Sequence, residues 1–143
     1  SNKTGGANLE GSLEDILAEI YDTAELDDSF REWTETGLVK TEMTAENSPN
    51  YFNTDGIAFE SGLASEPVMM PSAYLLTLIR VKDGADIEKI KSDIRDNADP
   101  MRWICVGVDP ANVYVGNVGD VVLLVMSDDA GKALYEAFLA LGK

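Results

Sequence analysis

The feature that most constrains the fold is a run of six consecutive apolar residues at positions 121–126, Val-Val-Leu-Leu-Val-Met. A strand with one face in water alternates apolar and polar side chains, and this run does not alternate. The run therefore predicts a central strand with both faces covered. The turn-forming sequence Gly-Asn-Val-Gly-Asp at 116–120 separates it from the apolar residues 113–115, so the two segments are expected to form a hairpin.

Three further segments have strand patterns. Residues 74–81, Tyr-Leu-Leu-Thr-Leu-Ile-Arg-Val, are mostly apolar and lie between Pro71-Ser72 and Asp83-Gly84, which are turn-forming pairs. Residues 56–63 and 38–43 have weaker patterns. We expect these two to form strands nearer an edge of the sheet.

Three segments have the apolar spacing of an α-helix. The first is a stripe that begins after Ser12, a predicted N-cap, and fades into the acidic residues 25–28; its members are Leu13, Ile16, Leu17, Ile20, Tyr21 and Ala24. Residues 86–97 place Ile87, Ile90 and Ile94 inward, and the last helix has the stripe Ala130, Ala133, Leu134, Ala137, Phe138 and Leu141. A short helical piece is also expected after Asp99-Pro100, because proline suits the first helical position, although residues 103–106 have strand propensity.

The order of helices and hairpins predicts an α+β domain with a largely antiparallel sheet and about three helices packed mainly on one face. A chain of 143 residues corresponds to one domain. We expect that domain at residues 12–143, after a flexible polar tether at residues 1–11, which are small, polar and glycine-rich. Neither an initiator methionine nor a signal segment opens the chain, which indicates a fragment whose beginning has been removed.

The charge of the chain excludes some partners. With 11 Lys and Arg against 26 Asp and Glu, the net charge is −15. Nucleic acid is not an expected partner, because its phosphates are met by Lys and Arg. An anionic membrane surface is disfavoured for the same reason. Since nothing approaches 18 consecutive apolar residues, no transmembrane segment is expected.

The residue types present exclude most catalytic and metal chemistry. Histidine is absent, and the single cysteine, Cys105, lies among apolar residues, where we expect it to be a buried core residue. The acidic cluster Asp22, Glu25, Asp27 and Asp28 lacks the spacing of a calcium loop and is interpreted as a solvated helix end. With 26 acidic residues, some pair will always have the spacing that a glycosidase needs, so that spacing is uninformative. We predict no catalytic residues, no metal and no cofactor.

One segment is not explained by folding alone. Val68, Met69 and Met70 lie between Pro67 and Pro71, and such a sequence fits poorly into a regular sheet ladder. Met69 and Met70 are therefore a candidate partner surface, since methionines serve adaptable interfaces. The alternative is a connection tucked over the core.

The order of these elements resembles a domain-of-unknown-function family of envelope lipoproteins from Gram-positive, often gut-dwelling, bacteria. The likeness is carried by the helix opening at residues 12–17, the strand at 74–83, the Ile87/Ile90/Ile94 helix and residues 119–127. It contains no catalytic motif. What it implies is an extracytoplasmic location through a lipidated cysteine and a polar tether, although that cysteine is not in this chain and the stretch 44–71 is longer than the family pattern.

Three functions follow as hypotheses. The first is a non-catalytic module, anchored outside the membrane, that binds a protein or a small ligand. The second is a small hydrolase that works through carboxylates. The third is a cytoplasmic regulatory domain that dimerises through an exposed sheet edge.

Overall fold

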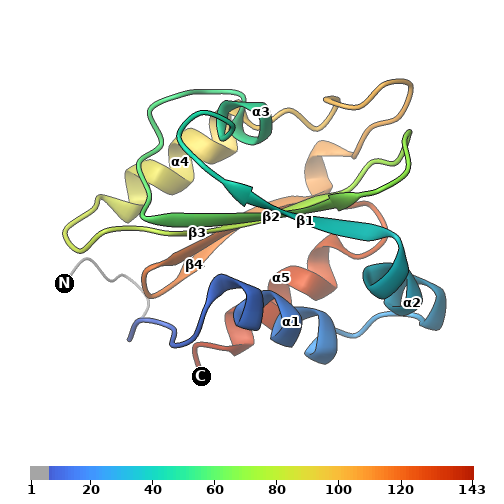
Figure 1. Ribbon diagram of the computed structural model, residues 1–143, viewed down its shortest axis with the longest axis horizontal. Coiled ribbons are helices and arrows are strands. Elements are labelled where there is room, and N and C mark those ends of the chain that lie inside the picture. The colour runs from blue at the N-terminus through green and yellow to red at the C-terminus, as the bar shows by residue number, and fades with distance from the viewer. Residues whose placement is uncertain (1–6) are drawn as a thin grey trace.

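A computed structural model describes residues 7–143 and shows one five-stranded antiparallel sheet with helices packed against it (Figure 1). The predicted α+β fold is confirmed. The strands follow the order β1-β2-β3-β5-β4 across the sheet, and every neighbouring pair is antiparallel. Their bounds are β1 Leu38–Met43, β2 Ser61–Pro67, β3 Leu75–Arg80, β4 Val113–Val118 and β5 Val121–Met126.

The apolar run at 121–126 forms β5, and all six of its residues are buried. It lies between β3 and β4, as expected of a strand covered on both faces. The predicted hairpin is confirmed: Val118 pairs with Val121 across a two-residue turn that begins at Gly119, whose φ of 56° is one that glycine adopts readily. β1 is an edge strand, and β2 begins only at Ser61, so most of the candidate strand 56–63 is connection.

The three predicted helices are present. They are α1 Leu13–Thr23, α4 Ile87–Asn97 and α5 Gly131–Ala140. Ser12 caps α1 by accepting a hydrogen bond from the Asp15 N–H at 3.0 Å. Asp86 caps α4 in the same way through the Lys89 N–H. These local signals were sufficient because each helix has a continuous apolar stripe, and α1 and α4 also have a polar N-cap.

Two helices were not predicted, α2 Asp28–Thr36 and α3 Pro49–Phe52. The acidic run was interpreted as the fading end of the first helix. In the structure α1 ends at Thr23, and Asp27 starts α2 by accepting the Phe30 N–H at 2.8 Å. An Asp at the N-cap indicates the start of a helix, but Asp27 could not be distinguished as a cap because three other acidic residues lie close to it in the sequence.

The helices form two layers. α1, α2 and α5 lie on one face of the sheet, called here the α1 face, and α3 and α4 lie on the other, the α4 face (Figure 1). The second layer goes beyond the expectation that helices pack mainly on one face. It is required because β3 and β5 are apolar on both sides, and an uncovered side would expose that surface to water.

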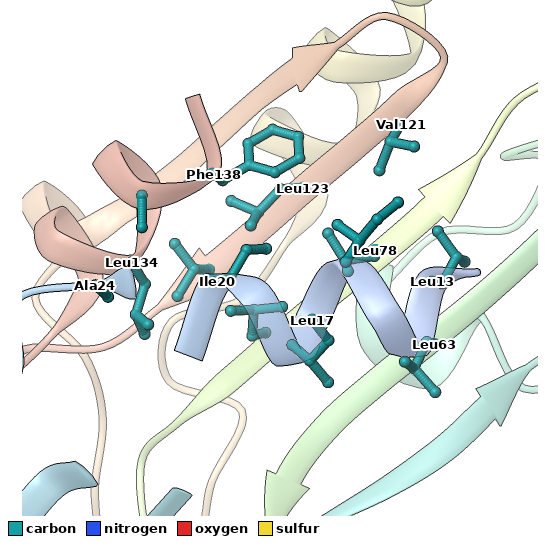
Figure 2. Close-up of a cluster of buried hydrophobic side chains, with 14 of the residues drawn as sticks. Leu13, Leu17, Ile20, Ala24, Leu63, Leu78, Val121, Leu123, Leu134 and Phe138 are labelled. Carbon is teal, nitrogen blue, oxygen red and sulfur yellow. The ribbon is translucent and has the colours of Figure 1, made fainter. Parts of the chain in front are cut away.

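Each face has its own core. On the α1 face, Leu17 and Ile20 of α1 and Leu134 and Phe138 of α5 meet Leu123 of the sheet (Figure 2). On the α4 face, the main buried side chains are Phe52, Leu75, Ile79, Ile87, Ile94, Trp103 and Leu124. The sheet thus separates two apolar cores, and its strands contribute side chains to both.

The segment after α4 differs from its prediction. Residues 98–108 form turns, and the short helix expected after Asp99-Pro100 is absent. The Asp99 carboxylate instead accepts the Met101 N–H at 2.9 Å, which closes a turn. Trp103 is buried, whereas Cys105 is exposed and has a left-handed φ of 67°. The prediction of a buried Cys105 was wrong, because Trp103 fills the core and the chain turns outward after it.

Part of the predicted tether contacts the domain. The Arg80 guanidinium donates to the carbonyl oxygens of Leu9 and Gly11 at 2.9 and 2.8 Å, and Leu9 packs against the core. The same guanidinium pairs with Asp120 at 2.8 Å. Residues 1–6 lie outside the described residues. In the part of the chain that is described, no helix has the length and apolar character needed to cross a membrane.

Candidate functional site

A cleft of about 450 Å³ opens at the end of the sheet where α2, the β2–β3 connection and the start of α5 meet. This volume lies within the range of small-ligand sites, about 300–1,000 Å³. The lining residues come from three separate parts of the chain: Asp27, Ser29, Phe30, Trp33, Ser72, Ala73, Tyr74, Ser127 and Asp129.

Two partly exposed aromatic rings, Phe30 and Trp33, form the apolar wall of the cleft, and the buried Tyr74 ring lies behind them. The ring centroids of Phe30 and Trp33 are 5.3 Å apart, and that of Tyr74 lies 5.8 Å from Phe30 and 5.4 Å from Trp33. All three pairs are edge-to-face, the arrangement that aromatic quadrupoles favour. Phe30 and Trp33 are partly exposed, so they present ring surface to the cleft.

The placement of these rings follows from local structure. Phe30 and Trp33 are three residues apart on α2 and therefore lie on the same side of that helix. Gly37 follows α2 directly, and a Cβ at Gly37 would overlap the Trp33 indole. The absence of that Cβ lets the indole lie against the backbone at Gly37 and reach Tyr74, the residue before β3.

Behind the aromatic wall lies a buried chain of hydroxyl groups. The Tyr21 hydroxyl is 2.7 Å from the Tyr74 hydroxyl and 2.7 Å from the Ser65 Oγ. Burial raises the pKa of Tyr21 to about 12 and raises the pKa of Tyr74 well above its ordinary value. Both phenols therefore stay neutral at physiological pH, and the chain fixes the Tyr74 ring at the base of the cleft.

The charges of the cleft are all negative. Asp27 and Asp129 are exposed and line it, and none of its described lining residues is basic. Hydrogen bonds from the Phe30 N–H and the Ser29 hydroxyl hold the pKa of the Asp27 carboxyl below its ordinary value. Asp27 therefore remains ionised, which is the opposite of what a general acid needs.

Two helix N-termini also face the cleft, and a capping side chain occupies one N–H donor at each. The Phe30 N–H of α2 is taken by Asp27, and the Ala130 N–H at the start of α5 is taken by the Ser127 Oγ at 3.0 Å. Each helix start carries about half a positive charge, whereas Asp27 and Asp129 each carry a full negative one. The local field is therefore negative, and the cleft disfavours anions.

An acidic hollow adjoins the cleft and shares Asp129 with it. Glu25, Asp128 and Glu136 also line the hollow, against one basic side chain, Lys132. Hydrogen bonds from the Asn112 side chain and the Asp109 N–H keep the pKa of Asp128 below its ordinary value. The hollow extends the negative field beyond the cleft.

The predicted candidate residues, Met69 and Met70, lie in the connection that leads to this site and do not line the cleft. Met69 and Met70 are 74% and 59% exposed, which excludes the alternative of a connection tucked over the core. They belong to the same β2–β3 connection that lines the cleft through Ser72 and Ala73. The two tryptophans differ in burial: Trp103 is buried, whereas Trp33 is only partly buried and lines the cleft.

The acidic residues of the first interhelical segment have different roles. Asp27 caps α2 and lines the cleft, and Glu25 lines the neighbouring hollow. Within residues 7–143, no group of three or more Asp, Glu, Cys or His side chains has the arrangement needed to hold a metal ion. Comparison of the chain with protein-family models, curated proteins and solved structures finds no match. The resemblance to envelope lipoproteins therefore stays a prediction.

Proposed function

We propose that this protein is a binding module whose cleft receives an organic cation, an ammonium or guanidinium group carried by a small molecule or by a partner's side chain. The observation that carries the proposal is the lining of the cleft, two partly exposed aromatic rings, Phe30 and Trp33, beside two carboxylates and no basic residue among the described lining. Aromatic faces attract cations through their quadrupole, by about 0.5–2 kcal/mol per contact depending on desolvation. Carboxylates add a longer-range attraction.

The same lining argues against the hydrolase hypothesis. A carboxylate-dependent hydrolase needs one acid with a raised pKa beside an ionised one. Asp27 has a lowered pKa and is held by two hydrogen bonds as a helix cap. Binding rather than acid catalysis is the chemistry that this carboxylate supports.

The test is a titration that separates charge from shape. Tetramethylammonium and choline are added to the protein at 0.15 M salt, with 3,3-dimethylbutanol as the uncharged isostere of choline, and heats of binding are recorded. We expect both cations to bind with a dissociation constant of about 1 mM, which corresponds to a binding free energy of about −4 kcal/mol. The isostere should bind about tenfold more weakly or worse. Equal binding of the isostere, or binding of acetate, would overturn the proposal.

Variants locate the site. Asp27→Asn keeps a good N-cap residue but removes the charge, and Asp129→Asn removes the second charge. Both should weaken cation binding, whereas Asp55→Asn, the same change at an exposed acid outside the cleft, should not. If all three variants weaken binding alike, net charge rather than the cleft is responsible.

Fluorescence reports the cleft directly. Trp103→Phe leaves Trp33 as the only indole, so quenching by the bound cation then comes from the cleft. Amides of lysine and arginine, titrated the same way, distinguish a partner's side chain from a small ammonium compound. Absence of any Trp33 response while heat of binding persists would place the cation elsewhere.

The extracytoplasmic, lipoprotein-type location is a separate proposal that is supported by the family resemblance alone. The reading frame upstream of Ser1 tests it. A signal segment ending in a cysteine at the lipidation position would support the proposal, and its absence would support the cytoplasmic alternative.

A further inference from the structure

The outer edge of β1 is unpaired within residues 7–143, because β1 ends the sheet and only β2 adjoins it. The Val68 N–H donates to the Gly37 carbonyl at 2.9 Å, which places a hydrogen-bonded pair at Gly37. Bonded and non-bonded pairs alternate in an antiparallel ladder, so Val39, Thr41 and Met43 bond inward to β2.

The backbone groups of the intervening residues, Leu38, Lys40 and Glu42, therefore point outward. The Glu42 carbonyl already accepts a hydrogen bond from the Asn47 side-chain amide at 2.9 Å, so a second strand would share that oxygen through its second lone pair. The edge thus offers a row of backbone donors and acceptors to another strand.

We propose that β1 pairs antiparallel with β1 of a second copy of this chain about a two-fold axis at Thr41. In that register Lys40 lies opposite the other copy's Glu42, and Glu42 opposite its Lys40. On the α4 face Val39 lies opposite the other copy's Met43, and Thr41 lies opposite itself. The Thr–Thr and opposite-charge pairs are kinds that stabilise neighbouring strands, whereas Met43 is buried within its own copy and gives Val39 little contact.

The charge pattern selects this register over its neighbours. A shift that centres the axis on Lys40 places two ammonium groups directly opposite each other. A shift that centres the axis on Val39 places Lys40 opposite Leu38 and leaves both charges of the edge without a partner. Only the axis at Thr41 pairs every charged residue of β1 with its opposite.

The self-complementary charges of Lys40 and Glu42 favour a second copy over an unrelated strand. On the α4 face Val39 is 46% exposed, Thr41 is half-buried and Met43 is buried within its own copy, so the backbone of a second strand at this edge would shield Val39. The net charge of −15 on each copy opposes association, so the dimer is expected to be weak and to need the two cross-strand ion pairs.

Charge reversal tests the register by sedimentation equilibrium at 0.15 M salt up to millimolar protein. The unmodified chain should show a concentration-dependent dimer, and Lys40→Glu or Glu42→Lys alone should weaken its self-association by about tenfold or more. The double variant Lys40→Glu/Glu42→Lys restores opposite charges and should dimerise as the unmodified chain does.

A mixture supplies the control. Lys40 shares a surface hollow with Asp22 and Glu35, so Lys40→Glu also changes repulsion within one copy. Lys40→Glu mixed with Glu42→Lys should form a heterodimer more tightly than either variant pairs with itself, which repulsion within a copy does not produce. A monomer at all concentrations, or dimers that ignore these charges, would overturn the proposal.

Discussion

The two faces of the sheet are closed by different means. On the α1 face, α1 and α5 supply side chains in regular helical stripes (Figure 2). α2 adds the partly buried Phe30 and Trp33, and a hydroxyl chain links Tyr21 to the sheet. On the α4 face, α4 covers only part of the sheet, and the rest is covered by the four-residue α3 and the turns at 98–108.

The irregular cover of the α4 face depends on a few side-chain contacts. Arg102 donates to the Asn50 carbonyl at 2.8 Å and lies 5.7 and 5.5 Å from the ring centroids of Tyr51 and Trp103. Met101 and Ile104 in the same turns remain exposed. The two faces of the sheet are therefore buried by different kinds of structure: helices whose sequences specify them locally on one face, and loops held by a few side-chain contacts on much of the other.

The largest expected effects come from matched core truncations. Phe138 of α5 and Phe52 of α3 are both fully buried, one on each face. Phe138→Ala should cost about 3–5 kcal/mol of unfolding free energy, because a regular helix cannot collapse into the cavity. Phe52→Ala should cost less, since the turns around α3 can relax. Urea unfolding of the two variants measures these losses. An equal or larger loss of unfolding free energy in Phe52→Ala would show that the two faces do not differ in how they respond to a cavity.

The buried tyrosines provide the next comparison. Tyr21→Phe leaves the buried hydroxyls of Ser65 and Tyr74 short of a partner and should cost about 2–3 kcal/mol. On the other face, Tyr51→Phe should cost less, because the partner of its hydroxyl, Glu66 at 2.9 Å, is only partly buried and can turn to water.

These tyrosines also predict a dependence on alkaline pH. Burial raises the pKa of Tyr21 to about 12 from its usual value of about 10 in an unfolded chain. A raised folded pKa means that the stabilisation is complete below pH 10 and is lost as pH rises through about 12. Urea midpoints between pH 9 and 12 should fall less in Tyr21→Phe than in the unmodified chain. An identical fall in both would show that Tyr21 does not contribute.

Two glycines allow the same substitution on opposite faces. Gly37→Ala drives a Cβ into the Trp33 indole, and Gly62→Ala places one 2.8 Å from the Cβ of Met43 on the α4 face. Each overpacked variant should lose about 1–2 kcal/mol of unfolding free energy. Only Gly37→Ala should change the Trp33 emission and weaken cation binding. If Gly62→Ala also changed both the Trp33 emission and the cation binding, the α4 face and the α1 face would be coupled through the sheet.

Local signals explain why part of the fold could be predicted. Ser12 and its apolar stripe specify α1, and the unbroken run at 121–126 specifies a strand buried on both faces. α2 was missed because Phe30 and Trp33 are its only large apolar residues and its cap lies within an acidic run. The outward turn at Cys105 was missed because its cause, the burial of Trp103, is a tertiary contact.

The candidate site was less accessible from the sequence than the fold. Tyr74 meets Trp33 only because β3 lies two strands from β1 and α2 packs beneath them, and sequence spacing does not reveal such an arrangement. Met69 and Met70 were identified because two prolines exclude that segment from a regular ladder, which is a local property. Local rules thus find the exposed connection that leads to the cleft, whereas the aromatic wall depends on the three-dimensional arrangement.

The smallest expected effect concerns these methionines. Met69→Ser and Met70→Ser should each change the unfolding free energy by less than about 0.5 kcal/mol, because exposed side chains lose little contact on truncation. Val68→Ser, also exposed in this connection, is the matched control. If Met69 and Met70 contact the partner protein that carries the cationic group, their replacement should weaken binding of that protein but not binding of tetramethylammonium. Equal weakening of both would instead place Met69 and Met70 against the cation itself and extend the cleft to the tip of the β2–β3 connection.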